Sequence, residues 1–237
     1  MKLIEVQNIC KSFGELKVLD SVSLSVGSGE SIAIVGPSGV GKSTLLRIIS
    51  GLDDPDSGTV NVFTEKVSMV FQYSALLNSY TVKENIELAF NGNKLSKEQV
   101  EEKIHEKLKI VGLEKYIDHF PDELSGGQKK RIAFARAIAS EPQVILYDEP
   151  TSGLDPILST LIEDYINKLS NELKVASVVV THHLSTIKRT AKKVLMLFQG
   201  KVVWEGSPNE FFITDNPYVK QFVEARVEGP MLSGLLE

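Results

Sequence analysis

The sequence predicts an α/β fold with a parallel core sheet, an N-terminal antiparallel β lobe and an inserted helical lobe. Short apolar runs at residues 31–35, 144–147 and 175–181 are separated by helical patterns, which is typical of parallel strands covered on both faces. Residues 3–26 instead alternate apolar and polar side chains between glycines, which favours an antiparallel edge. Helical signals dominate residues 74–140, so the helical lobe is expected there.

The bulk composition fits a single domain covering residues 1–237. Hydrophobic residues make up 42% of the chain and charged residues 24%, which is ordinary globular usage with no compositional signal of disorder. The formal net charge is −5, and no Lys/Arg block is longer than Lys129-Lys130-Arg131, so no nucleic-acid partner is expected. The single cysteine, Cys10, excludes an internal disulfide, and we predict that it packs in the core.

The sequence also predicts a cytoplasmic location. Glu5 interrupts the apolar stretch that a secretion signal would need. No run of residues approaches the roughly 20 apolar residues that span a bilayer. Any membrane role is therefore expected to depend on a partner.

The first elements are expected in a strand-rich order. Strands are predicted at residues 3–6 and 19–26, and the apolar run at 31–35 predicts a third strand. A glycine-rich turn follows, and then residues 43–50 show a helical pattern that ends at Gly51. This order is strand, loop, helix.

One helix of the helical lobe can be placed with its cap. Residues 96–111 repeat apolar side chains at helical spacing and end at Gly112. Ser96 and Gln99 stand at the spacing of a capping box. The sequence therefore predicts an amphipathic helix here.

The last third of the chain returns to strands that alternate with helices, which again predicts a parallel sheet. The expected elements are a strand at 144–147, a helix at 156–169, a strand at 175–181, a helix after His183, an antiparallel strand pair around Gly200 and a tail helix at about 216–227.

The strongest local motif is a phosphate loop, which makes this a P-loop NTPase fold. Its residues are Gly36, Pro37, Ser38, Gly39, Val40, Gly41, Lys42 and Ser43, and with Thr44 they are the predicted nucleotide-binding residues. Glycines let backbone N–H groups turn toward one phosphate, Lys42 adds a cation near the β- and γ-phosphates, and the Ser43 hydroxyl can bind Mg²⁺. The alternative is a flexible glycine turn that caps a helix. That alternative does not explain the Lys-Ser pair or the predicted strand and helix on either side of the loop.

Two adjacent carboxylates, Asp148 and Glu149, end the apolar strand at residues 144–147. Adjacent side chains on a strand point in opposite directions, so the two acids are expected to have different roles. We assign Asp148 to the metal and Glu149 to the attacking water, which are both required for phosphoryl transfer. Acids also end strands at the surface, and this pair alone would not decide between the two interpretations.

A third motif carries a resemblance to a known family. Its residues are Leu124, Ser125, Gly126, Gly127 and Gln128, followed by a helix at residues 132–139. Ser125 and Gln128 could simply form a capping box, but a capped helix start with two glycines is also an anion site. Together with the phosphate loop and the acid pair, this motif resembles the signature of ABC-type ATPases, and the resemblance covers essentially residues 1–212. It implies that the signature reaches the γ-phosphate held by a second copy.

The resemblance implies further site residues in the family's order. Gln72 matches the Q-loop glutamine that contacts Mg²⁺ and faces the membrane subunit, and His182 matches the switch histidine at the γ-phosphate. Phe13 lies where an aromatic ring stacks on adenine. Without the family context, these would be a surface Gln, a strand-end His and a core Phe. The D-loop at the dimer interface matches Ser152, Gly153, Leu154 and Asp155.

The chain departs from the family pattern in two places that bear on the site. The stretch between residues 60 and 67 is shorter than the usual hairpin. His183 stands where an acid often follows the switch histidine. Neither departure removes a predicted catalytic group.

Two stretches narrow the resemblance to ABC ATPases of the Mla type, which traffic phospholipids. Residues 71–86 resemble the Q-loop region of that group, and residues 219–230 resemble its tail, with a terminal Gly-Pro. The alternatives are a generic coupling surface and an amphipathic packing helix. The implied partners are an integral membrane permease, a lipid-binding substrate protein and a small accessory subunit on the tail.

The sequence thus predicts the ATP-hydrolysing subunit of an ABC transporter that works as a homodimer with ATP and Mg²⁺. It would sit peripherally on the cytoplasmic face of the inner (cell) membrane through its permease. The predicted catalytic residues are Glu149, His182 and Lys42, and the predicted metal ligands are Ser43, Gln72 and Asp148. The alternatives are an ATPase for a small polar or amino-acid substrate, a soluble ABC ATPase acting on ribosomes or DNA, and a nucleotide switch without turnover.

Overall fold

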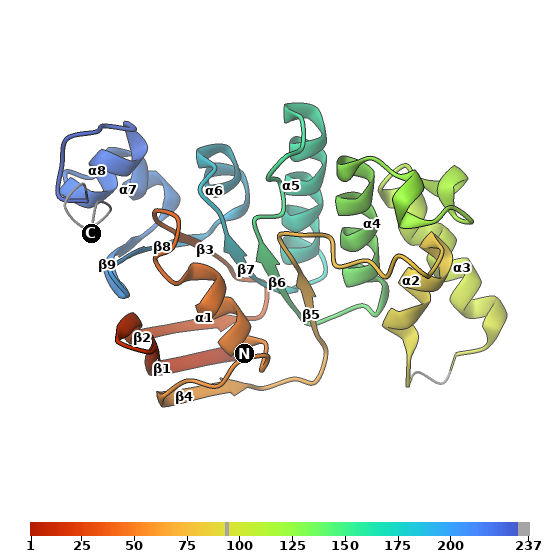
Figure 1. Cartoon of the computed structure of the whole chain (residues 1–237), viewed down its shortest axis with the longest axis horizontal. Helices are drawn as coiled ribbons and strands as arrows, with labels where there is room; N and C mark the ends of the chain where they lie inside the picture. The colour runs from red at the N-terminus through yellow and green to blue at the C-terminus, as the bar shows by residue number, and fades with distance from the viewer. Residues whose placement is uncertain (93–94, 232–237) are drawn as a thin grey trace.

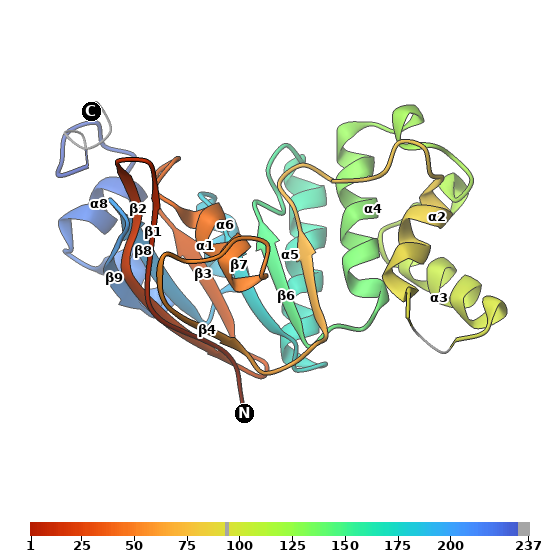
Figure 2. The same ribbon diagram turned by 60° about the horizontal axis from the view of Figure 1, so that its bottom comes forward.

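Two β-sheets enclose one helix at the centre of the molecule (Figure 1). The structure, a computed structural model, describes residues 1–92 and 95–231. The enclosed helix is α1 (Lys42–Ile49), whose predicted range of 43–50 is confirmed to within one residue. Turning the molecule shows the smaller sheet and the larger sheet on either side of it (Figure 2).

The smaller sheet is antiparallel, with the strand order β2-β1-β4. Its strands are β1 (Lys2–Phe13), β2 (Leu16–Gly27) and β4 (Ser57–Val62). The two strands predicted first are confirmed but are longer, because β1 and β2 form one hairpin paired from Lys2↔Gly27 to Phe13↔Leu16. The prediction that Cys10 packs in the core is wrong. Cys10 is partly exposed on β1, where its Sγ accepts a hydrogen bond from the Ser21 N–H at 3.3 Å.

The larger sheet has the strand order β5-β6-β7-β3-β8-β9. Its strands are β3 (Ser31–Val35), β5 (Val67–Val70), β6 (Val144–Asp148), β7 (Ala176–Val180), β8 (Lys193–Phe198) and β9 (Lys201–Gly206). Every neighbouring pair is parallel except β8 and β9. This confirms the parallel core sheet and the antiparallel pair around Gly200.

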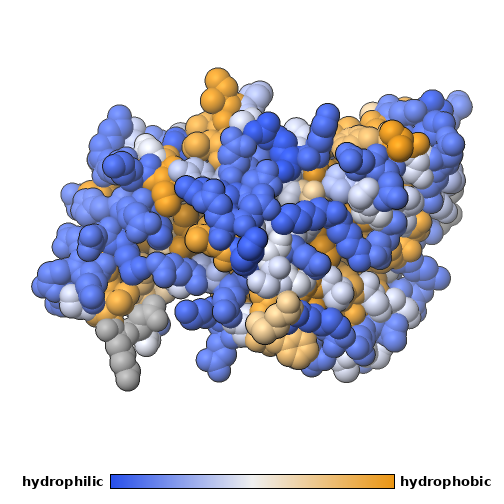
Figure 3. Space-filling view, turned by 180° about the vertical axis from the view of Figure 1, so that it is seen from behind, coloured by the Kyte–Doolittle hydropathy of each residue, from blue (hydrophilic) through white to orange (hydrophobic). Residues whose placement is uncertain are grey.

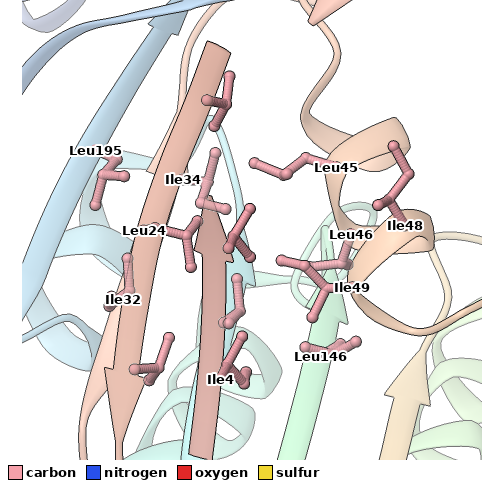
Figure 4. Close-up of a cluster of buried hydrophobic side chains, with 14 of the residues drawn as sticks. Ile4, Leu24, Ile32, Ile34, Leu45, Leu46, Ile48, Ile49, Leu146 and Leu195 are labelled. Carbon is pink, nitrogen blue, oxygen red and sulfur yellow. The ribbon is translucent and has the colours of Figure 1, made fainter. Parts of the chain in front are cut away.

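Strands β3, β6 and β7 are buried along their whole length, because both faces of the sheet are covered. On one face, α1 and the smaller sheet contribute to a cluster that includes Ile4, Ile34 and Leu46 (Figure 4). Burying each such side chain contributes about 1.5 to 3 kcal/mol. This cluster fixes α1, and with it the loop that precedes α1, against the sheet.

The other face of the sheet is covered by helices that continue into the helical part of the chain. These elements are α2 (Val82–Glu87), η1 (Leu88–Phe90), α3 (Lys97–Ile110), η2 (Glu114–Tyr116), η3 (Pro121–Glu123), α4 (Gly126–Ala139) and α5 (Pro156–Asn171). One buried cluster joins Tyr147 of the sheet, Phe134 of α4 and Ile104 of α3. Helix α3 begins after Ser96 with the predicted Ser96–Gln99 capping box. The helical part therefore packs as a continuation of the core.

The C-terminal elements form a third buried cluster at the end of the sheet near β8. They are α6 (Leu184–Thr190), α7 (Pro208–Ile213) and α8 (Pro217–Val223), the last capped by Asn216. Phe211 and Val219 are buried there against β8. The side-chain amide of Gln221, in α8, donates to the carbonyls of Arg226 and Val227 at 3.3 and 3.2 Å and so fixes the chain that follows the helix.

The face of the molecule seen from behind is largely hydrophilic, with hydrophobic patches between hydrophilic residues (Figure 3). In the described ranges 1–92 and 95–231, no helix has both the length and the apolar character required to cross a membrane.

Candidate active site

Four neighbouring parallel strands bring the predicted site residues to one edge of the larger sheet. Asp148 on β6 is level with Val180 on β7, and Val180 is level with Ile34 on β3. The residues just beyond the ends of these strands and of β5 include Gln72, Glu149, His182 and Gly36. This is the edge at which α/β sheets bind ligands.

The phosphate loop takes its shape from three glycines with positive φ. Gly36, Gly39 and Gly41 have φ angles of 145°, 82° and 98°. A Cβ on Gly36 would overlap the carbonyl oxygen of Leu197, and one on Gly41 would lie 2.7 Å from the Val18 carbonyl oxygen. Both the backbone conformation and the close approach of other strands therefore require glycine.

Lys42 is held over this loop. Its ammonium donates to the carbonyls of Gly36 and Pro37 at 2.8 and 2.7 Å, and the side chain is buried. Burial lowers the pKa of Lys42, while the charges of Glu149 and Asp148 raise it. The cation thus stands between the backbone of the loop and the two carboxylates, in a position to bind an anionic ligand.

Ser43 and Asp148 fit a magnesium ion. The Ser43 hydroxyl donates to Asp148 Oδ1 at 3.0 Å, and such oxygens are the ligands that Mg²⁺ prefers. Burial raises the pKa of Asp148; the bond from Ser43 lowers it in part, the Glu149 charge raises it, and the Lys42 charge lowers it. A buried carboxylate whose pKa is raised in this way is a site that a cation would stabilise. The third predicted ligand, Gln72, is exposed just beyond the neighbouring strand β5.

Glu149 is buried and paired with the predicted switch histidine. Its Oε1 lies 2.7 Å from Nδ1 of His182, and its backbone N–H donates to the Val180 carbonyl at 2.9 Å. Its φ of 49° is in the left-handed region, which costs a non-glycine residue roughly 1 to 2 kcal/mol. Such strain is often found at functional sites.

His183 follows the switch histidine and lies beside it. The centroids of the His182 and His183 rings are 4.2 Å apart. Burial lowers the pKa of His183, and the nearby His182 lowers it further. His183 therefore belongs to the same cluster as Glu149, which the sequence alone did not indicate.

The segment that connects Gln72 to α2 is fixed by two side chains that sequence reasoning missed. Arg136 of α4 donates to the carbonyls of Ala75 and Ser74 at 2.9 and 3.3 Å. Asn85 of α2 is fully buried, accepts from the Leu77 N–H at 2.8 Å, and donates to three carbonyls of this segment. A polar Asn on the apolar face of a helix was the available signal, because a buried amide has to find partners.

The motif at residues 124–128 forms a capped helix start. The Ser125 hydroxyl accepts from the Gln128 N–H at 3.3 Å, and the Gln128 side chain accepts from the Ser125 N–H at 2.7 Å. The capping box is therefore present, which leaves Gly126 and Gly127 at the first turn of α4 without side chains. Backbone N–H groups at such a helix start attract anions.

The predicted D-loop lies against the start of α4 in the same chain. Lys130 of α4 donates to the Ser152 carbonyl, and the Leu154 side chain is in van der Waals contact distance of a Cβ built on Gly127. Asp155 then caps α5 by accepting from the N–H groups of Ile157 and Leu158 at 2.9 and 3.0 Å. The two motifs are thus held together as one surface.

The phosphate loop and the start of α4 face the same side of the molecule but do not meet within it. In Figure 1 the upper edge of the larger sheet carries the loop before α1, and the start of α4 lies on that side beyond α5. The arrangement within one copy is compatible with the predicted composite site.

Phe13 is exposed at the end of β1, with 54% of its surface accessible. The ammonium of Lys11 lies 5.5 Å from the centre of its ring. This exposure favours a ligand-facing ring over a core residue. The stacking of Phe13 on adenine stays a prediction.

Comparisons with known proteins were made on the sequence and on the structure. A family model described as "ABC transporter" matches residues 19–152. The Arabidopsis thaliana protein TRIGALACTOSYLDIACYLGLYCEROL 3, chloroplastic, is 41% identical over 97% of this chain and 75% of the relative. The methionine import ATP-binding protein MetN of Clostridium tetani is 38% identical over 94% of this chain and 74% of the relative. The arginine transport ATP-binding protein ArtM of Bacillus subtilis is 39% identical over 90% and 94%.

Among solved structures, the ATP-binding cassette MJ0796, as a dimer in a post-hydrolysis state bound to ADP and Pi, superposes with a TM-score of 0.82. The two chains are 33% identical, and the match covers 87% of this chain and 99% of the other.

Proposed function

Because this chain belongs to the ABC transporter family as an ATP-binding subunit, we propose that its ATP hydrolysis drives phospholipid trafficking between membranes through a separate permease. Family membership makes the chain an ATPase whose hydrolysis of ATP is coupled to transport. The observation that carries the proposed mechanism is the placement of two pairs, Ser43–Asp148 and Glu149–His182, at the strand edge beside the phosphate loop.

In this mechanism, residues 36–44 bind the phosphates of ATP through backbone N–H groups and Lys42. Ser43, Asp148 and Gln72 would hold Mg²⁺, which neutralises charge on the phosphate oxygens when it is bound. Glu149 accepts a hydrogen bond from the attacking water and orients it toward the γ-phosphorus. The oxygen–phosphorus bond to water forms as the bond to ADP breaks, the proton that the water loses passes to the Glu149 carboxylate and then to solvent, and Lys42 and His182 stabilise charge on the transferred group.

The mechanism includes a second copy of the chain. Proteins of this family work as dimers with membrane permease subunits, and the related cassette MJ0796 is a dimer with ADP and Pi. We place residues 124–128 of one copy on the γ-phosphate bound by the other, and residues 152–155 at the contact between them. Separation after hydrolysis would then move the segment beyond Gln72 and the permease helices that it contacts.

Two observations support the phospholipid assignment. Residues 71–86 and 219–230 resemble the corresponding regions of Mla-type ATPases, and one relative carries the name of a galactosylated diacylglycerol lipid. The first stretch exposes the rings of Tyr73 and Tyr80 and the side chain of Leu77, which offers a permease an apolar contact. The assignment adds a lipid-binding substrate protein and a small accessory subunit on the tail. It also places the chain on the cytoplasmic face of the inner (cell) membrane.

A second candidate is the ATPase of an importer for amino acids or other small polar substrates. The relatives named for methionine import and arginine transport favour it. The two candidates share the whole hydrolytic site and differ in the permease and in the cargo.

The first experiment tests hydrolysis. Glu149→Gln keeps the size of the side chain but removes the carboxylate, so we expect ATP turnover to fall by about 100-fold or more. The variant should also accumulate as an ATP-bound dimer. Phosphate release and size-exclusion chromatography with ATP measure the two effects.

Glu102→Gln, which changes an exposed acid on α3, is the matched control. Unchanged hydrolysis in the Glu149 variant would remove Glu149 from its assigned role.

The second experiment tests the cargo. The chain is purified under mild detergent with its native partners, and the bound subunits and lipids are identified by mass spectrometry. A permease with co-purified phospholipid supports the first candidate. A permease with a soluble amino-acid-binding protein and no enriched lipid supports the second.

A further inference from the structure

Three side chains at the active-site edge bring metal-ligating atoms together. Glu149, His182 and His183 each offer one ligand atom, and the three atoms lie within 4.8 Å of one another. Within this group, Glu149 Oε1 and His182 Nδ1 are 2.7 Å apart. This cluster is distinct from the Ser43–Asp148 pair, because it contains two imidazoles.

The local backbone explains why adjacent histidines converge. On a continuing strand, residues 182 and 183 would point to opposite faces. Here β7 has already ended at Val180, and the His183 N–H turns back to donate to Thr181 Oγ1 at 3.0 Å. The two rings therefore lie side by side, with an angle of 34° between their planes. The carboxylate of Glu149, whose φ is positive, lies beside them.

Two polar atoms of the cluster are buried without a hydrogen-bond partner among the described residues, namely Glu149 Oε2 and His183 Nε2. Glu149 itself is 7% exposed. A buried acceptor without a partner costs about 1 to 3 kcal/mol. A cation between the carboxylate and the imidazoles would remove this cost.

We propose that Glu149, His182 and His183 form a binding site for Zn²⁺, and that Zn²⁺ bound there blocks ATP hydrolysis. Two imidazoles and one carboxylate with an open fourth position are a preferred donor set for Zn²⁺. Mg²⁺ prefers oxygen ligands and favours Ser43 and Asp148 instead. Ligand chemistry therefore favours Zn²⁺ at the cluster of Glu149, His182 and His183, and Mg²⁺ at the neighbouring Ser43–Asp148 pair.

Binding and inhibition are separate parts of this inference. Binding follows from the positions of the three ligands. Inhibition rests on the proposed function, because Zn²⁺ would occupy the carboxylate assigned to the water and the imidazole assigned to the γ-phosphate.

The binding experiment uses the full nucleotide-free chain and Co²⁺, which reports tetrahedral coordination by visible absorption. We expect the unmodified chain to develop the tetrahedral spectrum and Zn²⁺ to displace it. His183→Asn should weaken Co²⁺ binding by at least about tenfold. Asn is a favoured residue at the start of a helix, so the start of α6 is retained. His105→Asn, which removes an exposed histidine from α3, should bind as the unmodified chain does.

Equal Co²⁺ binding by the His183 variant and the unmodified chain would overturn the site. The hydrolysis experiment titrates buffered Zn²⁺ at constant Mg²⁺ and ATP, and each variant is compared with its own rate without Zn²⁺. The inhibitory Zn²⁺ concentration should rise at least about tenfold in His183→Asn and stay constant in His105→Asn.

The outcomes separate this inference from the proposed function. Metal binding that depends on His183 but leaves hydrolysis unaffected would overturn the inhibition and the assigned role of Glu149 together. Loss of turnover in Glu149→Gln without any Co²⁺ spectrum in the unmodified chain would overturn the zinc site alone.

Discussion

Gly36 is the residue at which the phosphate loop depends most on having no side chain. Its φ of 145° is unfavourable for other residues, and the Leu197 carbonyl of β8 occupies the direction in which a Cβ would point. At Gly36 the loop therefore packs directly against β8, a strand that contributes no predicted catalytic residue. Gly39 differs, because a Cβ built on it meets no atom within 4 Å.

Gly36 and Gly39 allow a matched test within one loop. Gly36→Ala combines backbone strain with a steric overlap, so we expect it to destabilise the fold by at least about 3 kcal/mol. Gly39→Ala adds strain alone and should cost about 1 to 2 kcal/mol. Urea unfolding measures both changes. Equal losses of stability in the two variants would contradict the role given to the Leu197 contact.

At the level of single residues, the sequence pointed to candidate site residues more readily than to the residues that hold the neighbouring loops in place. Ser43, Asp148, Glu149 and His182 were predicted from motifs, because each motif specifies a residue type at a fixed spacing. Asn85, whose partners lie in a loop, has no such spacing to reveal it. Its bonds to that loop depend on how the chain folds back onto α2.

At the level of elements, α2 is the anchor of the segment that follows Gln72. Helix α2 has only six residues and begins with a complete capping box between Thr81 and Glu84. Helices this short are marginal by themselves, so α2 depends on its packing and on its caps. Asn85, which is buried in α2, then holds the segment before the helix through its hydrogen bonds to Leu77 and Tyr80.

Asn85→Ala should therefore loosen the loop. The substitution removes the acceptor of the Leu77 N–H and the donor to the Tyr80 carbonyl, whereas the Leu77 and Thr81 carbonyls keep backbone donors, and we expect a loss of about 2 to 4 kcal/mol. Hydrogen exchange of residues 74–81 should become faster. Asn78→Ala changes an exposed amide in the same segment and is expected to alter neither measurement. Unchanged exchange in the Asn85 variant would show that the loop is held by other contacts.

Element positions were predictable to different degrees for physical reasons. Buried strands such as β6 and the capped helix α3 carry strong local signals, namely continuous apolar runs and a capping box. The pairing of β1 with β4 was not predictable, because it joins strands about fifty residues apart and depends on register. Cys10 was misplaced for a similar reason, since its exposure depends on how β1 pairs with both β2 and β4.

At the level of the whole molecule, the site lies on a single side and is divided between distant elements. The phosphate loop and the start of α4 are separated by α5, as Figure 1 shows. In the composite site that we propose, each complete site requires two copies. The hydrolytic chemistry would then depend on the concentration of dimer.

Mixing two inactive variants tests the division. Lys42→Ala removes the cation of the loop, and Ser125→Arg places a bulky cation at the start of α4. We expect each variant alone to hydrolyse little ATP. Mixed pairs contain one intact composite site, so an equal mixture should recover about a quarter of the unmodified rate when subunits exchange freely. Phosphate release at several mixing ratios measures the recovery. No recovery in pairs that demonstrably exchange subunits would contradict the composite site.

Helix α4 has a mechanical consequence. It begins at the tip formed by Gly126 and Gly127, and in its last turns Arg136 grips the carbonyls of Ser74 and Ala75. A hydrogen-bonded helix of this length is about 20 Å long and bends little. Tilting α4 therefore also displaces the segment at Ser74 and Ala75 that Arg136 holds. A displacement of that segment would in the same way move the start of α4.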